Sequence, residues 1–373
     1  MKIIQSIIRS EEVRILGLDI GGAFSKAALI QFENKKTIKS NSYIEYFPFW
    51  EESINQFSLL LKNILMNIFS DVGIRAEDIK YIAVTMTAEL SDAFQTKKEG
   101  VLTILKELSK VFEIEKLRFI TTQNKFIEYE EAQNNPYLLA AANWVSTALF
   151  LGHFISNCIL IDSGSTTIDV IPIHKSIPVS VGKNDIERIV NHELIYTGGL
   201  RATIPSITHF VPYKNQMVRI SFEKFALISD VHRILNNISE EEYINDTADN
   251  RSKSLDNCYA RLSRIICMDI EGVSKKELDL IASYIYRKQL ELVKDEIKEF
   301  LENLKRSVPE LYKSEPLFVI TGLSAKFLIE KVLRELNYNK IENYENITNI
   351  PNNINSSAFA VAGTFYHQLI NSE

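Results

Sequence analysis

The chain has 373 residues, of which 46% are apolar and 24% are charged, and its formal net charge is −6 at pH 7. This length allows two domains, and a mildly acidic chain without a basic stripe offers no electrostatic basis for binding nucleic acid. The three cysteines, Cys158, Cys258 and Cys267, have no CxxC spacing, which argues against a disulfide framework or a cysteine zinc site and favours a cytoplasmic protein. In the segment 1–12 the apolar stretch is too short, and charged residues follow it too early, for a secretion signal.

Strands and helices alternate along the chain, which predicts an α/β class with a mixed sheet. In the first half we expect a strand hairpin over 13–32, a strand over Tyr43–Phe49, a helix over Ser53–Ser70, a strand over Tyr81–Thr85, a helix over Val101–Phe112, a strand over Leu117–Ile120 and a buried apolar helix over Leu138–Ile155. In the second half we expect a hairpin from Cys158 to about Val181, glycine turns at Thr197–Leu200 and mostly helix beyond. The later elements are a helix over Leu278–Leu304, a strand over Leu317–Thr321, helices over Ala325–Leu336 and Ser356–Ile370, and exposed loops over Asn236–Asn257 and Asn339–Asn355.

Two stretches, Leu16–Ile30 and Leu160–Ile173, carry the same pattern of a strand ending in Asp, a turn of small residues and a second strand. At an offset of 143 residues Asp19 meets Asp162, Gly21 meets Gly164 and Lys26 meets Asp169. A turn of small residues lets backbone N–H groups converge on phosphate oxygens, and an Asp at the strand end can hold Mg²⁺ on them. The repeat therefore predicts two similar domains that grip a polyphosphate.

The candidate ligands of this polyphosphate come from both hairpins. The expected metal ligands are Asp19 and Asp162, and the expected phosphate-binding residues are Gly21, Gly22, Ser25, Lys26, Gly164, Ser165, Thr166 and Thr167. The alternative is purely structural, because Asp caps its own backbone beside Gly/Ser turns and Thr is common in strands. The six histidines have no metal spacing and are expected to be structural or exposed.

The order of these motifs resembles that of the actin, sugar kinase and heat-shock chaperone superfamily, whose third motif contacts a nucleoside. The resemblance implies a two-domain actin-like ATPase (ribonuclease H-like) fold with the site in the interdomain cleft. The implied domains are 1–155 and 156–350, and the helix within 351–373 is expected to pack back between them. The third motif, residues 319–328, departs from the usual Gly-Gly pattern because Leu323 and Ser324 follow Gly322. This departure favours a site that keeps the phosphate turns and dispenses with the nucleoside.

A narrower resemblance rests on segments spread over most of residues 13–365. GLDIGG at 17–22, AAANW at 140–144, LIDSGSTTIDVIPI at 160–173, ELIYTGGLRATIP at 193–205, DVHRIL at 230–235 and NDTADNR at 245–251 resemble the hydantoinase-A-like proteins linked to tetrahydromethanopterin one-carbon metabolism. A characterised member joins an aminomethyl-furanmethanol diphosphate to γ-glutamyltyramine in methanofuran biosynthesis. The resemblance implies a transferase that uses Mg²⁺, binds these two small molecules, forms an aryl ether and releases diphosphate.

The remaining candidate residues concern the acceptor. Glu89 lies on a strand-end loop with Thr85 and Thr87 nearby, where it could act as general base, although a solvated Glu or a helix N-terminal acid is the alternative. Further candidates for substrate binding are Asn143, Trp144, Gly198, Arg201, Gly322 and Ser324. For Trp144 the alternative is a core position, and for Arg201 a surface salt bridge.

Two other functions remain open from the sequence. One keeps ATP, as in a small-molecule kinase or a hydantoinase/oxoprolinase-type lactamase; the incomplete third motif and the compact length argue against it. The other is a non-enzymatic ATPase switch of the actin or chaperone kind; the short tail after the third motif leaves no room for a peptide-binding domain.

Overall fold

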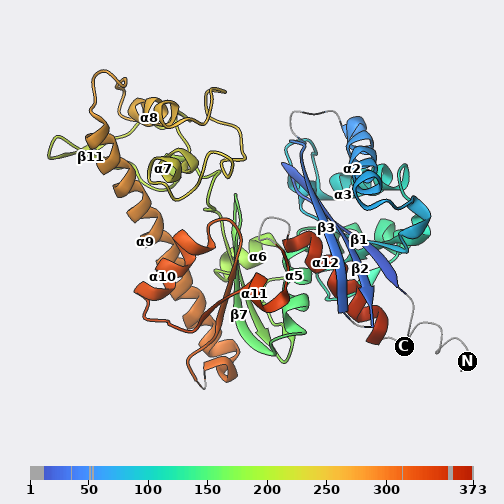
Figure 1. Ribbon diagram of the computed structural model, residues 1–373. Coiled ribbons are helices and arrows are strands. Elements are labelled where there is room, and N and C mark those ends of the chain that lie inside the picture. The colour runs from blue at the N-terminus through green and yellow to red at the C-terminus, as the bar shows by residue number, and fades with distance from the viewer. Residues whose placement is uncertain are drawn as a thin grey trace, which may run out of the picture.

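The computed structural model describes residues 12–34, 36–49, 52, 54–312, 314–351 and 356–371. Expectations for 1–11, Ser53 and 352–355 lie outside this set. The described residues form two α/β lobes on separate sheets, with a smaller distal lobe beside the upper end of the long helix α9 (Lys275–Ser307) (Figure 1). Among them no helix combines the length and the apolar character needed to cross a bilayer.

The first lobe is built on a six-stranded sheet of order β3-β2-β1-β4-β5-β6. Its strands are β1 (Val13–Ile20), β2 (Phe24–Glu33), β3 (Lys36–Tyr46), β4 (Tyr81–Met86), β5 (Leu117–Ile120) and β6 (Phe126–Ile127). Its helices are η1 (Ile54–Gln56), α2 (Phe57–Val72), η2 (Ala76–Asp78), η3 (Ala88–Leu90), α3 (Lys97–Ser109), η4 (Ile114–Lys116), α4 (Tyr129–Asn134) and η5 (Pro136–Leu138). The helix α5 (Asn143–Gly152) contacts strands of both sheets. β1 runs antiparallel to β2 and parallel to β4. One face of the sheet shares an apolar core with α2 and α3.

The second lobe repeats this topology. Its sheet has the order β10-β8-β7-β13-β14, with β9 paired to β8, and β7 runs antiparallel to β8 and parallel to β13. The strands are β7 (Asn157–Ser163), β8 (Ile168–His174), β9 (Ile177–Pro178), β10 (Leu194–Ile195), β13 (Phe318–Thr321) and β14 (Ile341–Asn343). The helices are α6 (Asp185–Val190), α9, η7 (Pro309–Tyr312), η8 (Ala325–Ile329), α10 (Glu330–Glu335) and α11 (Tyr344–Thr348). The duplication expected from the two hairpins is thus present in the whole sheet.

The distal lobe has its own core. It consists of η6 (Ile204–Ser206), β11 (Phe210–Tyr213), β12 (Gln216–Arg219), α7 (Ile228–Ile234) and α8 (Leu255–Arg264), which pack on the first half of α9. Its centre holds a buried ion pair in which Arg261 Nε donates to Asp230 Oδ1 at 2.8 Å, and the Tyr243 hydroxyl donates to the same oxygen at 3.0 Å. Burial of both charges is tolerated because each is paired and hydrogen-bonded.

The helix α12 (Ser356–Asn371) returns to the first lobe. It packs on β1, β2, β4 and α5, and in Figure 1 it lies beside the first sheet near the middle of the molecule. A glycine makes this approach possible: a Cβ atom on Gly17 would lie 2.0 Å from the Ala358 carbonyl oxygen. β1 and α12 are therefore in direct backbone contact.

Five sequence expectations need correction. The apolar helix starts at Asn143 instead of Leu138, because Ala141 has φ 51° and breaks the run. The helical region contains the hairpin β11–β12, whose two-residue loop Lys214–Asn215 has positive φ at both positions, as in a type I′ turn. The segment Asn339–Asn355 contains β14 and α11, and the segment Asn236–Asn257 contains the fully buried Tyr243. The strand expected over Tyr43–Phe49 runs from Lys36 to Tyr46.

Candidate functional site

The first hairpin turn presents its backbone to a cavity. The Gly21 N–H donates to the Phe24 carbonyl at 2.9 Å, which closes the turn. The carbonyls of Gly22 and Ala23 are occupied on the other side, where they accept from Phe49 N–H at 3.1 Å and Phe47 N–H at 2.8 Å. Gly22 and Ala23 themselves line the cavity. The Gly22 and Ala23 N–H groups donate no backbone hydrogen bond among the described residues, so they can donate to an anion.

The second turn is held in the same way. The Gly164 N–H donates to the Thr167 carbonyl at 2.9 Å. The carbonyls of Gly164, Ser165 and Thr166 accept from the N–H groups of 198–201 at 2.9 to 3.0 Å. In both hairpins, a neighbouring segment thus occupies carbonyl groups of a turn that lines the cavity.

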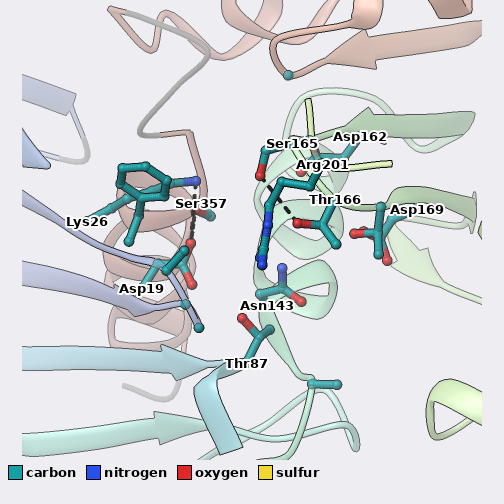
Figure 2. Close-up of a pocket in the computed structure, with 18 of the residues that line it drawn as sticks. Asp19, Lys26, Thr87, Asn143, Asp162, Ser165, Thr166, Asp169, Arg201 and Ser357 are labelled. Atoms are coloured by element: carbon teal, nitrogen blue, oxygen red, sulfur yellow. Dashed lines mark hydrogen bonds and ion pairs between the residues drawn. The ribbon is translucent and has the colours of Figure 1, made fainter. Parts of the chain in front are cut away.

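The two strand-end carboxylates occupy equivalent register positions. Asp19 lies opposite Lys26 on β2 and Thr85 on β4, and Asp162 lies opposite Asp169 on β8 and Thr321 on β13. The positions that the offset of 143 residues aligns are therefore structurally equivalent. Figure 2 shows Asp19 and Lys26 on one side of the cavity, and Asp162 with Ser165 and Thr166 on the other.

Asp19 is fixed by two partners through one of its oxygens. Its Oδ2 accepts from the Ser357 hydroxyl of α12 and lies 3.8 Å from Lys26 Nζ. Its Oδ1 is buried and has no hydrogen-bond partner among the described residues. An orphaned carboxylate oxygen beside a cavity is costly unless a ligand completes it.

Asp162 is surrounded by other acids. Desolvation by the surrounding protein, followed by the charge of Asp169 and, more weakly, of Glu345 and Asp19, raises the pKa of Asp162 to about 7, against the lowering effect of Lys26. A bound cation would relieve this repulsion. The described residues contain no cluster of three or more His, Cys, Asp or Glu placed as metal ligands. Two carboxylates with water and phosphate oxygens are what Mg²⁺ ordinarily takes, so the pair fits that ion.

Glu89 lies in η3, directly after β4, and lines the same cavity. Gly100 of α3 allows this packing, since a Cβ atom there would lie 2.7 Å from the Glu89 Cα. The carboxylate Oε1 accepts from the Ala141 N–H at 3.0 Å, while Oε2 is buried without a partner among the described residues. Burial raises the pKa of Glu89 to about 7, so the group can exchange a proton near neutral pH.

The cavity, of about 400 Å³, lies between the two lobes. Fourteen of the residues expected from the sequence line it: Asp19, Gly21, Gly22, Lys26, Thr87, Glu89, Asn143, Asp162, Gly164, Ser165, Thr166, Thr167, Arg201 and Gly322. Figure 2 places Arg201 and Asn143 between the two turns.

The other five expected residues lie behind the cavity wall. Ser25 and Thr85 are buried in the strands beside Asp19. Gly198 is buried behind the second turn, and its N–H donates to the Thr166 carbonyl at 2.9 Å. Ser324 is fully buried, with its Oγ 2.5 Å from Ser163 Oγ. Trp144 is a core residue, and the Arg188 Cζ atom lies over its ring, 4.5 Å from the ring centroid.

Several cavity residues were not expected from the sequence. Asp169 pairs with Arg188 at 2.6 Å, and desolvation raises the pKa of Asp169 despite this partner. Asp185 of α6 pairs with Lys97 of α3 at 2.7 Å and so joins the two lobes beside Glu89. Because the alignment of the two hairpins matches Lys26 with Asp169, it could have identified Asp169 as a cavity residue. No local sequence pattern predicts the ion pairs that Asp185 and Arg188 of α6 make.

Exposed apolar and aromatic side chains also line the cavity, among them Leu90 and Tyr196. Leu90 of the first lobe is 50% exposed and Tyr196 of the second lobe is 53% exposed, and both line the cavity. Desolvation and the charges of Asp185, Asp169 and Glu89 raise the pKa of Tyr196.

The hydantoinase/oxoprolinase family matches residues 80–363, and the chain belongs to this family. Within it, the chain is 36% identical over 318 residues to the "(4-{4-[2-(gamma-L-glutamylamino)ethyl]phenoxymethyl}furan-2-yl)methanamine synthase" of Methanocaldococcus jannaschii, covering 85% of this chain and 88% of that protein. The protein of the same name from Methanococcus vannielii is 36% identical over 172 residues, covering 46% of this chain and 73% of that protein. Relatives named as synthases support an enzyme.

A solved structure bears on the fold alone. Nucleotide-free acetone carboxylase is similar over 94% of this chain and 70% of that chain, with a TM-score of 0.50 and 12% identity. With the repeated sheet topology, this likeness agrees with the actin-like ATPase fold that the sequence resemblance implied.

Proposed function

We propose that the chain transfers the furan-methyl group of an aminomethyl-furanmethanol diphosphate to the phenol oxygen of γ-glutamyltyramine and releases diphosphate. The bond from the furan methylene to the diphosphate oxygen breaks, a bond from the methylene to the phenol oxygen forms, and the phenol proton passes to a base. The observation that carries this proposal is the pair of equivalent turns, each with its strand-end carboxylate, facing one cavity.

The donor side of the proposed site is the pair of turns. Backbone N–H groups of both turns and the ammonium of Lys26 bind the diphosphate oxygens, and Asp19 and Asp162 hold Mg²⁺. When bound, this ion neutralises charge that develops on the leaving diphosphate. Because Asp19 is fixed by Ser357 and Lys26, its other oxygen is already oriented before the substrate arrives.

The acceptor side is the end of the cavity that holds Glu89. A phenol has a pKa of about 10 and needs a base to react at neutral pH. Glu89 has one carboxylate oxygen without a partner among the described residues and a pKa of about 7, which suits it to take the phenol proton. Leu90 and Tyr196 line the cavity from opposite lobes and offer apolar and aromatic surface for the tyramine ring.

A product assay with a binding comparison tests the proposal. The protein is incubated with Mg²⁺, the furan-methyl diphosphate and γ-glutamyltyramine, and the ether and free diphosphate are quantified by mass spectrometry and a phosphate assay. The donor monophosphate is the matched control and is expected to react far more slowly. Calorimetry is expected to find ATP no tighter than pyrophosphate. Absence of the ether, or ATP binding far tighter than pyrophosphate, would overturn the proposal and favour an ATP-dependent enzyme.

A further inference from the structure

A chain of buried hydrogen bonds runs from the distal lobe to the second phosphate turn. Asn237 Nδ2 lies 3.1 Å from His232 Nδ1, and His232 Nε2 lies 3.0 Å from Gln289 Oε1. Gln289 Nε2 then donates to the Gly198 carbonyl at 3.1 Å and to Thr197 Oγ1 at 3.2 Å. Both His232 and Gln289 are fully buried, so solvent does not compete for the bonds that Gln289 makes.

The donors and acceptors of this chain can be arranged in only one direction. The Asn237 amide nitrogen can only donate, so His232 Nδ1 accepts and His232 Nε2 carries the proton. That proton is donated to Gln289 Oε1, which orients the Gln289 amide group toward Gly198. The ring must be neutral for this, and burial lowers the pKa of His232 to about 3. The imidazole thus has one tautomer and Gln289 has one orientation.

At its other end, this series of hydrogen bonds reaches the loop of residues 198–201, which holds the second turn. The N–H groups of Gly198 and Gly199 donate to the carbonyls of Thr166 and Gly164 at 2.9 Å. The backbones of the loop and the turn are in close contact, because a Cβ atom on Gly198 would lie 2.6 Å from the Thr166 nitrogen. Any shift of the Gly198 carbonyl is therefore transmitted to the turn.

We infer that Gln289, oriented by His232, is a positioning residue that fixes the second turn in the shape that binds diphosphate. Neither side chain lines the cavity, and each acts only through the Gly198 loop. The inference rests on the proposed function for the identity of the ligand and extends it by making the distal lobe part of the diphosphate site. The first turn is held differently, by the N–H groups of Phe47 and Phe49 of its own lobe.

Pyrophosphate affinity, measured by calorimetry with Mg²⁺ present, tests the inference. Gln289→Met is expected to weaken binding by about threefold to tenfold, the usual effect of one lost hydrogen bond. His232→Phe should weaken it similarly, since an unanchored amide can turn away from Gly198. The double variant should be no weaker than Gln289→Met alone, because both residues act through one bond. The KM for the acceptor should not change.

A second measurement reads the loop without any ligand. Hydrogen exchange of the amides of 198–201 is expected to accelerate in both variants, and Tyr243→Phe, which removes a buried hydrogen bond elsewhere in the distal lobe, is expected to leave exchange and pyrophosphate affinity as in the wild type. If Gln289→Met does not fold, Gln289→Glu, which keeps the bond from His232 but sets an acceptor against the Gly198 carbonyl, carries the same expectation. Unchanged exchange and affinity, or equal losses in Tyr243→Phe, would overturn the inference. A wild-type protein that does not bind pyrophosphate would instead refute the proposed function.

Discussion

Replacing Glu89 by glutamine separates its chemical role from its effect on stability. The side chain is 1% exposed, its Oε1 accepts from Ala141 N–H, and its Oε2 has no partner among the described residues. The glutamine side chain would keep the shape and the bond to Ala141 but could not take up a proton. If Glu89 is the base, turnover should fall by about 10²–10⁴-fold. The acidic limb of the pH–rate profile near pH 7 should disappear.

The same substitution has a pH-dependent effect on stability. The pKa of Glu89 rises from 4.5 to about 7 on burial, so the folded chain binds this proton more tightly than the unfolded chain. Stability contributed by the neutral carboxyl is therefore lost as the pH rises through this window. A pKa difference of about 2.5 corresponds to about 3 kcal/mol. The free energy of unfolding of Glu89→Gln relative to the wild type should increase by roughly this amount from about pH 4 to about pH 8.

Urea unfolding at a series of pH values, together with steady-state rates, measures both effects. Glu130→Gln is the matched control, because Glu130 lies on the surface of the same lobe and should change neither quantity. A Glu89→Gln protein with a near-normal rate, the wild-type pH–rate profile and a stability difference independent of pH would refute the reasoning. Glu89 would then be a packing residue alone.

Three further predictions concern the cavity and its walls. Asp19→Asn and Asp162→Asn should each lower turnover by at least about 100-fold with little change in melting temperature; an unfolded variant with normal turnover per folded molecule would contradict this. Lys97→Met should move the acidic limb of the pH–rate profile to higher pH and Asp185→Asn to lower pH, because Lys97 lowers and Asp185 raises the pKa of Glu89; shifts in one common direction would count against the arrangement. Gly322→Ala should lower the melting temperature by several degrees, since φ is +91° and a Cβ atom would lie 2.4 Å from the Ser163 carbonyl oxygen, whereas Gly22→Ala, with open space around its Cβ position, should melt like the wild type.

The paired hairpins could be found from the sequence because their chemistry is local. The Asp at the strand end, the small turn residues and the returning strand are consecutive, so aligning the two copies matched Asp19 with Asp162 and Lys26 with Asp169. The strand pairing of Asp19 with Lys26 and of Asp162 with Asp169 was seen only in the structure. Glu89 could be placed for the same reason, since it follows β4 directly. Its burial could not be predicted, because that depends on Gly100 and Ala141 folding over it.

Contacts between segments that are distant in the sequence leave no local sequence pattern from which they could be predicted. Ser357 reaches Asp19 across 338 residues, and the Lys97–Asp185 pair depends on how the lobes sit together. The break in the apolar run at Ala141 was missed because alanine is a strong helix former, and only the tertiary structure holds its φ at 51°. The Asn-rich segment around Tyr344 resembled a loop in composition, yet its tyrosine is fully buried against α5.

The return of α12 to β1 sets an order for biosynthesis. On the ribosome β1, β2 and β4 emerge hundreds of residues before Ser357. Until α12 is made, the sheet face that it covers has no complete partner, and an uncovered apolar face favours aggregation and chaperone capture. Residues 12–155 expressed alone should therefore be poorly soluble, and a synthetic peptide of 356–371 supplied in trans should rescue them. The first lobe is therefore synthesised before the second but completed after it.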